Sequence, residues 1–233
     1  MLATKSCSAM EDLGYIIFGC RSPLVVDYEE SLARCGFTVH SSVSLEGTPR
    51  VLDHSKVITI QELEARELED VGSGFISCAF SADRRRELVR LAREAGLKPA
   101  KALIDPTAVV PSSLRVGSGT FINAAAVIGG ATFVGSHVLI NRAASIGHHS
   151  FIGDYVSIAP GVTLASNVRI GEGVTIGAGA VVVPNIEIGE GAVIGAGSLI
   201  RKNVEAHSFW AGNPAISREL DRTRSALNTS GEE

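Results

Sequence analysis

Residues 141–185 read NRAASIGHHSFIGDYVSIAPGVTLASNVRIGEGVTIGAGAVVVPN, and an aliphatic residue returns at every sixth position. The same spacing extends in both directions, so the repeat runs from Ile104 to the region of residue 205. The repeating positions are Ile104, Val110, Val116, Ile122, Ile128, Val134, Ile140, Ile146, Ile152, Ile158, Leu164, Ile170, Ile176, Val182, Ile188, Ile194 and Ile200. A fixed period over such a stretch is the signature of a solenoid, in which each repeat packs against its neighbours.

A period of six excludes a long α-helix. Because an α-helix has 3.6 residues per turn, a residue that recurs every six positions forms no continuous stripe on its surface. Three hexapeptides instead complete one triangular coil, and successive coils stack at about 4.8 Å through parallel strand hydrogen bonds. We therefore predict a left-handed parallel β-helix of hexapeptide repeats over residues 101–205, with the aliphatic ladder along its axis.

Small residues accompany this ladder. The residue four positions after each aliphatic one is mostly small or β-branched, and Leu114 and Ile186 are the two bulky exceptions. A glycine often follows the aliphatic residue directly, as at Gly147 and Gly153. We interpret these glycines as corners of the coil, where a tight turn favours a backbone without a Cβ.

The first hundred residues are organised differently, because apolar strands alternate there with amphipathic helices. The expected strands are residues 14–19, 38–45, 56–60 and 74–80, and the expected helices include 61–68 and 83–95. Such alternation predicts a parallel sheet flanked by helices. We expect a small Rossmann-like α/β domain over residues 1–100, joined to the β-helix near Lys98 and Pro99.

A further helix is expected after the first strand. Ser22 followed by Pro23 is a typical helix start, with Ser as the N-cap and Pro at the first helical position. Gly36 is a suitable stop for this helix. At the other end of the chain the period breaks after Val204, so residues 206–233, which contain AGNPA, are expected to form a closing segment and a tail.

Composition limits the classes of partner. The 233 residues carry a formal net charge of −4, so we expect no nucleic acid or membrane partner. The four cysteines, at positions 7, 20, 35 and 78, form no C-x-x-C pair and indicate neither a zinc site nor a disulfide framework. The first twenty residues resemble neither a signal peptide nor a membrane span. We therefore expect a cytoplasmic protein with small-molecule ligands.

The order of a small α/β domain, a hexapeptide β-helix and a closing AGNPA resembles the NeuD/PglD-like family of sugar acyltransferases. The resemblance covers the whole chain in architecture and is most specific in residues 141–185. It implies transfer of an acetyl group from acetyl-CoA to an amine or hydroxyl of a sugar, a nucleotide-linked amino sugar or a similar polar metabolite. It also implies a homotrimer with intersubunit active sites and no metal.

The resemblance assigns the role of general base to His148, and imidazole suits this step because it exchanges a proton near neutral pH. His148 and His149 are the third and fourth residues of a hexapeptide, which places them at a corner of the β-helix. His149 replaces a family carboxylate that orients the base. Three consequences stay open: a slower enzyme, recruitment of Asp154, or proton uptake by His149 itself. Asn141 matches a family asparagine and is a candidate substrate-binding residue.

By the same resemblance, the donor site is mostly backbone. Ser157, Ser166, Ala178 and Ala196 match positions that contact acetyl-CoA in the family, and small side chains there leave the main chain open to the pantetheine amides.

For the acceptor, relatives place a Gly-rich loop ending in His after the first strand, where backbone amides at a helix start can hold phosphate. This chain has FGCRSP over residues 18–23 instead. Gly19 keeps the match, and Arg21 is a candidate anion ligand. The altered loop leaves the acyltransferase hypothesis unchanged, because that hypothesis rests on the β-helix. It weakens only the hypothesis that the acceptor is linked to a nucleotide.

Two alternative functions fit the same β-helix. A zinc carbonic anhydrase needs three histidines that converge between subunits, but Arg142 and Asp154 stand five positions after His137 and His149. The non-enzymatic alternative is a degenerate trimeric binding protein that has kept the β-helix and lost the chemistry. Release of free CoA thiol from acetyl-CoA distinguishes the enzyme from this second alternative.

Overall fold

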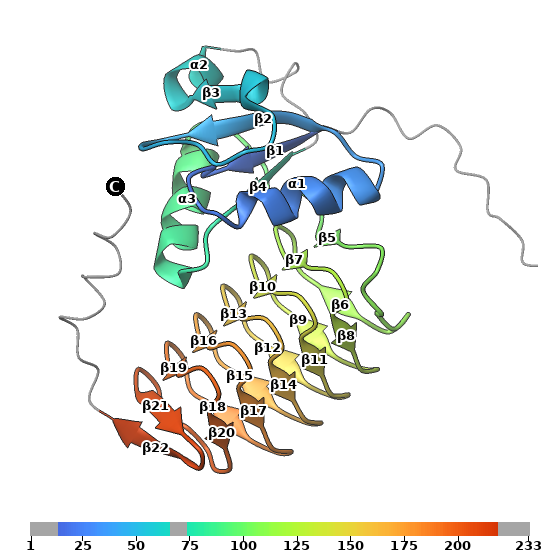
Figure 1. Cartoon of the computed structure of the whole chain (residues 1–233), viewed down its shortest axis with the longest axis vertical. Helices are drawn as coiled ribbons and strands as arrows, with labels where there is room; N and C mark the ends of the chain where they lie inside the picture. The colour runs from blue at the N-terminus through green and yellow to red at the C-terminus, as the bar shows by residue number, and fades with distance from the viewer. Residues whose placement is uncertain (1–13, 66–73, 219–233) are drawn as a thin grey trace, which may run out of the picture.

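The computed structural model describes residues 14–65 and 74–218, which form two stacked units (Figure 1). A small α/β unit lies at one end, and a prism of stacked coils extends from it to a C-terminal hairpin. Cys7, residues 66–68 of the predicted second helix and most of the predicted tail lie outside the described residues. No helix in the described ranges is long and apolar enough to cross a membrane.

The small unit contains a four-stranded sheet with the order β3-β2-β1-β4, in which every neighbouring pair is parallel. Its strands are β1 (Tyr15–Phe18), β2 (Val39–Ser44), β3 (Val57–Thr59) and β4 (Gly74–Ser77). β1 and β4 are buried over their whole length, as expected for apolar parallel strands covered on both faces. The predicted Rossmann-like sheet is therefore confirmed.

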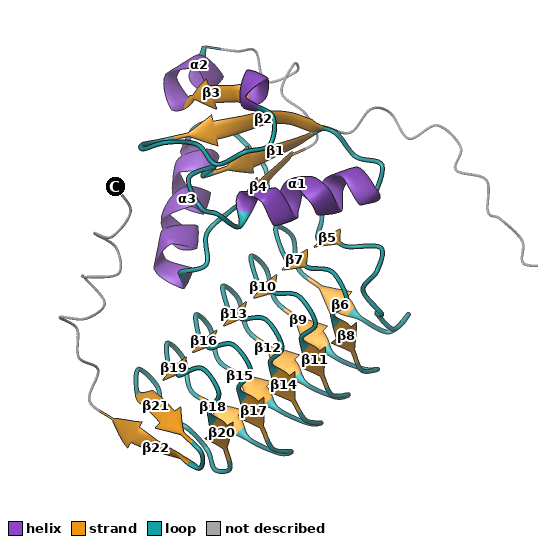
Figure 2. Cartoon of the chain, viewed as in Figure 1, coloured by secondary structure: helices purple, strands orange, loops and turns teal. Residues whose placement is uncertain are grey.

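The helices cover both faces of this sheet. α1 (Val25–Arg34) lies between the sheet and the prism (Figure 2), and it shares a core with prism residues Phe121 and Leu139. The helices α2 (Ile60–Glu64) and α3 (Ala82–Glu94) contribute to the core on the opposite face, and a short 3-10 helix, His54–Lys56, precedes β3. α1 thus makes one of the contacts through which the α/β unit rests on the prism.

The start of α1 differs from the prediction. Ser22 and Pro23 lie in a turn, and α1 begins only at Val25, without a side-chain cap. The Val25 N–H donates to the Ser22 carbonyl oxygen at 2.9 Å, so the Ser-Pro pair forms the turn before the helix instead of its first residues. The predicted stop is confirmed, because Gly36 follows the helix with a φ of 75°.

The prism is the predicted left-handed parallel β-helix, and three sheets form its faces. Ile140 lies opposite Ile122 and Ile158, which are 18 residues before and after it, so three hexapeptides make one coil. The first face consists of β5 (Leu103–Ile104), β7 (Phe121–Ile122), β10 (Leu139–Ile140), β13 (Ser157–Ile158), β16 (Thr175–Ile176) and β19 (Val193–Ile194). The second consists of β8 (Val127–Ile128), β11 (Ser145–Ile146), β14 (Thr163–Leu164), β17 (Val181–Val182) and β20 (Leu199–Ile200). The third consists of β6 (Arg115–Val116), β9 (Phe133–Val134), β12 (Phe151–Ile152), β15 (Arg169–Ile170) and β18 (Glu187–Ile188).

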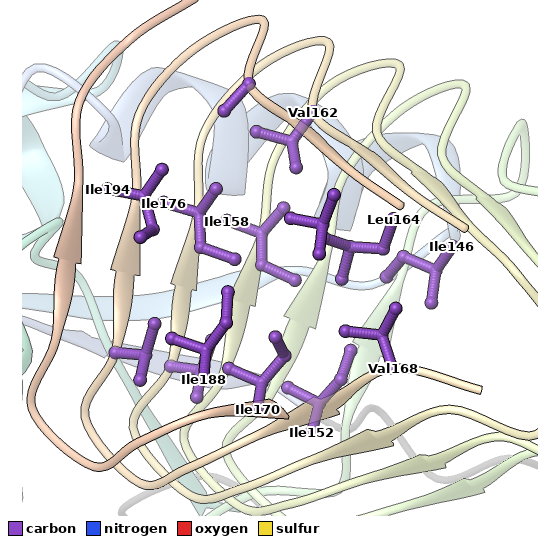
Figure 3. Close-up of a cluster of buried hydrophobic side chains, with 14 of the residues drawn as sticks. Ile146, Ile152, Ile158, Val162, Leu164, Val168, Ile170, Ile176, Ile188 and Ile194 are labelled. Atoms are coloured by element: carbon purple, nitrogen blue, oxygen red, sulfur yellow. The ribbon is translucent and has the colours of Figure 1, made fainter. Parts of the chain in front are cut away.

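The aliphatic ladder fills the axis of the prism (Figure 3). Ile152, Ile170 and Ile188 stack in one row and are fully buried, and Ile158 and Ile176 form part of another row. Burial of one such side chain contributes about 1.5–3 kcal/mol, so the ladder is a main source of stability for the stacked coils.

The glycines that follow the ladder residues serve coil stacking. A Cβ on Gly147 would lie 2.5 Å from the carbonyl carbon of Ala165 and from the nitrogen of Ser166 in the next coil. The left-handed turn conformation falls two residues later, at His149, where φ is 59°. The predicted position of Gly147 at a corner is therefore confirmed. The predicted reason for a glycine there, a tight turn at that residue, is wrong, because the close approach of the next coil is what excludes a Cβ.

A hairpin of β21 (Phe209–Gly212) and β22 (Ala215–Arg218) closes the prism. β21 extends the first face by pairing with β19, and β22 pairs with β21 in antiparallel orientation. AGNPA spans the junction of the two strands, and its Asn213 and Pro214 form the turn, with a cis bond between them. Trp210 is buried against the end of the aliphatic core. The closing segment therefore covers the open end of the ladder.

A buried carboxylate joins the two units. Asp105 is fully buried and accepts hydrogen bonds from the side chains of Ser31, Arg34 and Thr107. Burial alone raises the pKa of Asp105, but the hydrogen bonds from Ser31, Thr107 and Arg34 outweigh it and hold the pKa well below its ordinary value. Asp105 therefore fixes α1 against the first coil as a charged group.

Candidate active site

His148 and His149 lie at the corner between β11 and β12. We call this the histidine corner; it comprises residues 147–150 and the stacked turns at 129–132, 165–168 and 183–186. Both imidazoles are exposed, their Nδ1 atoms are 2.8 Å apart, and the rings meet edge to face at 87°. The predicted corner position therefore gives two adjacent imidazoles in direct contact.

The short distance between the two Nδ1 atoms restricts the tautomers of the pair. A hydrogen bond there needs one N–H and one lone pair, so one ring donates and the other accepts. When His148 is the donor, its Nε2 carries a lone pair that can accept a proton from a bound molecule. His149 is then the neutral acceptor that fixes the orientation of the His148 ring.

Asp154 does not serve as that carboxylate within one chain. It lies at the corner between β12 and β13, where its side chain accepts a hydrogen bond from the Ser136 N–H at 2.7 Å. The histidine corner lies at the other end of β12. The structure thus gives His149, and not Asp154, as the neighbour that orients His148.

The histidine corner continues along the prism with polar residues. Ser166 occupies the position of His148 one coil later, and the neighbouring Asn167 N–H donates to the His148 carbonyl oxygen at 2.9 Å. The Asn167 side-chain amide donates to the side-chain oxygen of Asn185 at 2.7 Å. Of the predicted donor-site residues, Ser166 is the one that the structure places beside His148.

Ala178 and Ala196 lie at a different corner, between the first and second faces. This alanine corner comprises residues 141–144, 159–162, 177–180 and 195–198. Both alanines are exposed, and within the described ranges neither backbone N–H has a hydrogen-bond acceptor. The two positions therefore fit the predicted backbone-lined donor site.

Asn141 begins the same corner but is buried. Its side-chain oxygen accepts hydrogen bonds from the Asn123 side chain at 3.0 Å and from the Arg142 N–H at 2.8 Å. Asp27 of α1 contacts both of these partners and forms an ion pair of 2.6 Å with Arg142. Asn141 thus helps to dock α1, and a single chain does not bring it to His148.

Ser157, a predicted acetyl-CoA contact, lies on the first face beneath the α/β unit. It is fully buried, and its hydroxyl donates to the Phe80 carbonyl oxygen at 2.5 Å and accepts from Arg85 at 2.9 Å. The structure places this side chain in the contact between the two units instead of on an open surface.

Gly19 and Arg21 line a cleft of about 470 Å³ in the α/β unit. The cleft lies at the carboxyl ends of β1, β2 and β4, where β1 has one neighbour on each side. Open α/β sheets bind ligands at such a switch point. Arg21 is exposed and has no hydrogen-bond or ion-pair partner in the described part of the chain, so its guanidinium is available to an anion.

Other residues of the cleft escaped the sequence analysis. Arg84, in the first turn of α3, forms ion pairs with Glu46 at 3.0 Å and with Glu87 at 2.6 Å. Ser81 is the N-cap of α3 and also lines the cleft. Glu46 follows β2, and Ser81 and Arg84 follow β4. Their positions at strand ends were therefore the signal that could have identified them.

Two cysteines complete the cleft without forming a reactive pair. Burial raises the pKa of the Cys78 thiol well above its ordinary value, and burial also raises the pKa of Cys20. Both thiols are free and stay protonated at neutral pH, so they line the cleft as weakly polar groups.

The cleft and the histidine corner lie on different sides of one chain. The α/β unit covers the first face, where Phe121 and Leu139 join its core. The histidine corner lies between the second and third faces. One copy of the chain therefore does not bring His148 to Gly19 and Arg21.

Within one chain the histidines do not converge as metal ligands. Within residues 14–65 and 74–218, no three His, Cys, Asp or Glu side chains are grouped to hold a metal ion. His137 is buried between the rings of Phe75 and Tyr155, away from the histidine corner. Burial lowers the pKa of His137 to about 4, so this ring is neutral at physiological pH.

A family described as bacterial transferase hexapeptide (six repeats) matches residues 167–202. A comparison with curated proteins gave no significant match. Among solved structures, the chain is similar to a perosamine N-acetyltransferase from Caulobacter crescentus, solved as a His-to-Asn variant with CoA and GDP-perosamine. The identity is 28%, the alignment covers 91% of this chain and 100% of that chain, and the TM-score is 0.82.

The acetyltransferase domain of PglB from Neisseria gonorrhoeae, in complex with acetyl coenzyme A, is 27% identical, with 89% of this chain and 100% of that chain covered and a TM-score of 0.78. WeeI from Acinetobacter baumannii, at 23% identity, covers 88% of this chain and 99% of that chain with a TM-score of 0.73, and shares the fold. The predicted resemblance is thus confirmed: this hexapeptide-repeat protein has the fold and two-unit architecture of the NeuD/PglD-like sugar acyltransferases.

Proposed function

We propose that the protein is an acetyltransferase that moves an acetyl group from acetyl-CoA to an amine or hydroxyl of a sugar or similar polar metabolite. The observation that carries the proposal is the exposed His148 ring, oriented through its Nδ1 by His149 at 2.8 Å. Such a base is held on a β-helix similar to that of acetyltransferases solved with CoA or acetyl-CoA.

His148 acts as the general base in direct transfer. Its Nε2 accepts the proton of the acceptor amine or hydroxyl while that nitrogen or oxygen attacks the thioester carbonyl carbon. The carbon–sulfur bond then breaks, the acetyl group remains on the acceptor, and the CoA thiolate takes the proton from His148. His149 keeps the ring oriented during both proton transfers because it accepts the Nδ1 hydrogen bond throughout.

The donor site is proposed on the corners of the prism. The backbone N–H groups of Ala178 and Ala196, which have no acceptor among the described residues, can donate to the carbonyl oxygens of the pantetheine arm. Ser166 lies one coil from His148 and can contact the thioester end of the donor. Ser166 lies at the histidine corner, whereas Ala178 and Ala196 lie at the alanine corner. A groove between neighbouring prisms, with one wall from each corner, would bring both corners to one donor molecule.

The acceptor site is proposed in the cleft of the α/β unit. Arg21 and the first turn of α3 offer positive charge to an anionic group there. Because the cleft and His148 lie on different sides of one chain, the proposal requires that the cleft of one copy meets the histidine corner of another. A homotrimer of parallel prisms satisfies this requirement.

The proposal is tested by the release of CoA thiol from acetyl-CoA. Each amino sugar is assayed in two forms, free and linked to a nucleoside diphosphate, and hydroxylated acids form a third group. We expect release above the rate of acetyl-CoA hydrolysis with at least one acceptor. Higher activity with the nucleotide-linked form would assign the cleft to the nucleotide. Binding of CoA without release in any arm would contradict the proposal and favour the degenerate binding protein.

A further inference from the structure

Arg85 is a fully buried cation at the contact between the α/β unit and the prism. Its guanidinium donates to the carbonyl oxygens of Ala79 at 2.8 Å and Phe80 at 2.7 Å in the α/β unit. On the prism side it donates to carbonyl oxygens and to one hydroxyl, those of His137, Tyr155, Val156 and Ser157. One side chain therefore holds main-chain groups of both units.

The acceptors of this guanidinium are all neutral. Among the described residues they are backbone carbonyls and the Ser157 hydroxyl, and none is a carboxylate. Burial lowers the pKa of Arg85 to about 10, which still leaves it charged at neutral pH. A buried charge is costly unless its donors are satisfied, so the carbonyl groups must keep their positions around it.

The α/β side of this contact is the wall of the cleft. Ala79 and Phe80 line the cleft together with Ser81, directly after β4. The Ser157 hydroxyl adds a second link, because it donates to the Phe80 carbonyl oxygen at 2.5 Å. Any shift of the Ala79–Phe80 wall relative to the coil at Ser157 therefore breaks hydrogen bonds in a buried site.

We propose that Arg85 is a positioning residue for the acceptor, and that it sets the place of the cleft wall along the prism. The inference rests on the proposed function, in which the cleft of one copy meets His148 of another. The prism carries both the histidine corner and the groups that bind Arg85. The position of the cleft along the axis of one prism therefore decides where its acceptor meets the neighbouring prism. Placement errors of about 1 Å can cost about 100-fold in rate.

A neighbouring arginine provides a matched control. Arg86 also connects α3 to the prism, through an ion pair of 3.0 Å with Glu172, but it is partly exposed and does not line the cleft. Exposed pairs of this kind contribute little to stability. Arg86→Gln therefore removes a contact between the two units without touching the cleft wall.

The experiment measures steady-state CoA release with the best acceptor from the panel, varying acceptor and acetyl-CoA separately. For Arg85→Lys we expect the acceptor KM to rise about tenfold and kcat/KM for the acceptor to fall by at least that factor, since one ammonium cannot reach both sets of carbonyls. The KM for acetyl-CoA is expected to stay within about twofold of wild type. Ser157→Ala keeps Arg85 and is expected to raise the acceptor KM about threefold.

Arg86→Gln should match wild type in both KM values. Circular dichroism and light scattering show which variants are folded and assembled; if Arg85→Lys does not fold, Ser157→Ala decides the question. An unchanged acceptor KM in the folded variants, with a lowered melting temperature alone, would contradict the positioning role. A rise in the acetyl-CoA KM of Ser157→Ala would also contradict it, because it would make Ser157 a donor contact. Wild-type protein that releases no CoA with any acceptor would instead overturn the proposed function itself.

Discussion

The position of His149 combines a left-handed backbone with a direct contact to the His148 ring. Its φ of 59° puts it in the left-handed conformation that recurs at the corners, where Ala143 and Asn167 have nearly the same value. Histidine tolerates this conformation better than most side chains do. The hexapeptide register was enough to predict a corner, but not the Nδ1 contact, because rotamers of exposed rings do not follow from spacing.

The role of His149 leads to a prediction about its replacement. His149→Ala should lower kcat by about 10-fold to 100-fold while the acetyl-CoA KM is unchanged, because His148 loses the acceptor that fixes its tautomer. His149→Asp should retain or raise kcat, since a carboxylate accepts the same Nδ1 hydrogen bond more strongly. Initial rates of CoA release measure both variants. Equal rates for wild type and His149→Ala would show that the contact has no role in catalysis.

At the scale of the elements, coil stacking decides which glycines are required. A Cβ on Gly171 would lie 2.5 Å from the Glu190 nitrogen in the next coil, whereas a Cβ on Gly161 would meet nothing within 4 Å. Gly161 has a φ of 66°, as the corner conformation requires. The sequence pattern placed Gly171 directly after a ladder residue but made no prediction about Gly161, which stands three positions after Ile158. It also could not separate close approach from turn conformation, because both favour glycine.

The two glycines should therefore respond differently to alanine. We expect Gly171→Ala to cost about 3 kcal/mol, because the coils must separate or distort. Gly161→Ala should cost about 1 kcal/mol, the strain of an alanine in the left-handed region. Melting temperatures from circular dichroism give the order of the two variants. A Gly161→Ala protein that is less stable than Gly171→Ala would contradict the stacking explanation.

The element boundaries show a similar limit. The alternation of strands and helices was enough to predict the sheet of the α/β unit. Its strands β1 and β4 are buried on both faces, so each of them appears in the sequence as a run of mostly apolar residues. Ser22 and Pro23 misplaced the start of α1, since the same residue types that start helices also form turns. The cleft residues Glu46 and Arg84 were missed because their roles depend on which strand ends lie side by side.

At the scale of the whole molecule, the two units are joined by buried polar groups whose residues lie far apart in sequence. Asp105 contacts Ser31 and Arg34, and Arg85 contacts Tyr155. These pairs carry no periodic signal, so the docking of the α/β unit on the first face could not be predicted. For the same reason the sequence did not reveal that Ser157 is buried under this unit.

The buried Asp105 makes stability depend on pH. Its folded-state pKa is lowered, so its stabilisation is present above the ordinary carboxyl pKa of about 4 and is lost as pH falls through the lower folded value. Asp105→Asn should be less stable than wild type by about 3 kcal/mol at pH 7, with a smaller difference near about pH 3. Exposed Asp83→Asn is the control. A difference independent of pH, measured by urea unfolding, would contradict this account.

The proposal that the active site is shared between copies leads to a prediction about mixed assemblies. His148→Ala and Arg84→Glu, which reverses a charge in the cleft, should each be nearly inactive alone. Mixed trimers formed on coexpression should regain activity, because some interfaces then combine an intact histidine corner with an intact cleft. If both parts acted within one chain, every chain would carry one defect and mixing would restore nothing. Light scattering should give a mass of three times 24.3 kDa.

The most direct test of the account is the turnover number of His148→Ala, with His207→Ala as its control. His207 is an exposed histidine with the same corner conformation, at a φ of 56°, but it lies on the last coil away from the histidine corner. We predict that His148→Ala lowers kcat for CoA release at least about 100-fold, while CoA binding and assembly are kept, and that His207→Ala behaves as wild type. Turnover of His148→Ala at the wild-type rate would contradict the assignment of the base.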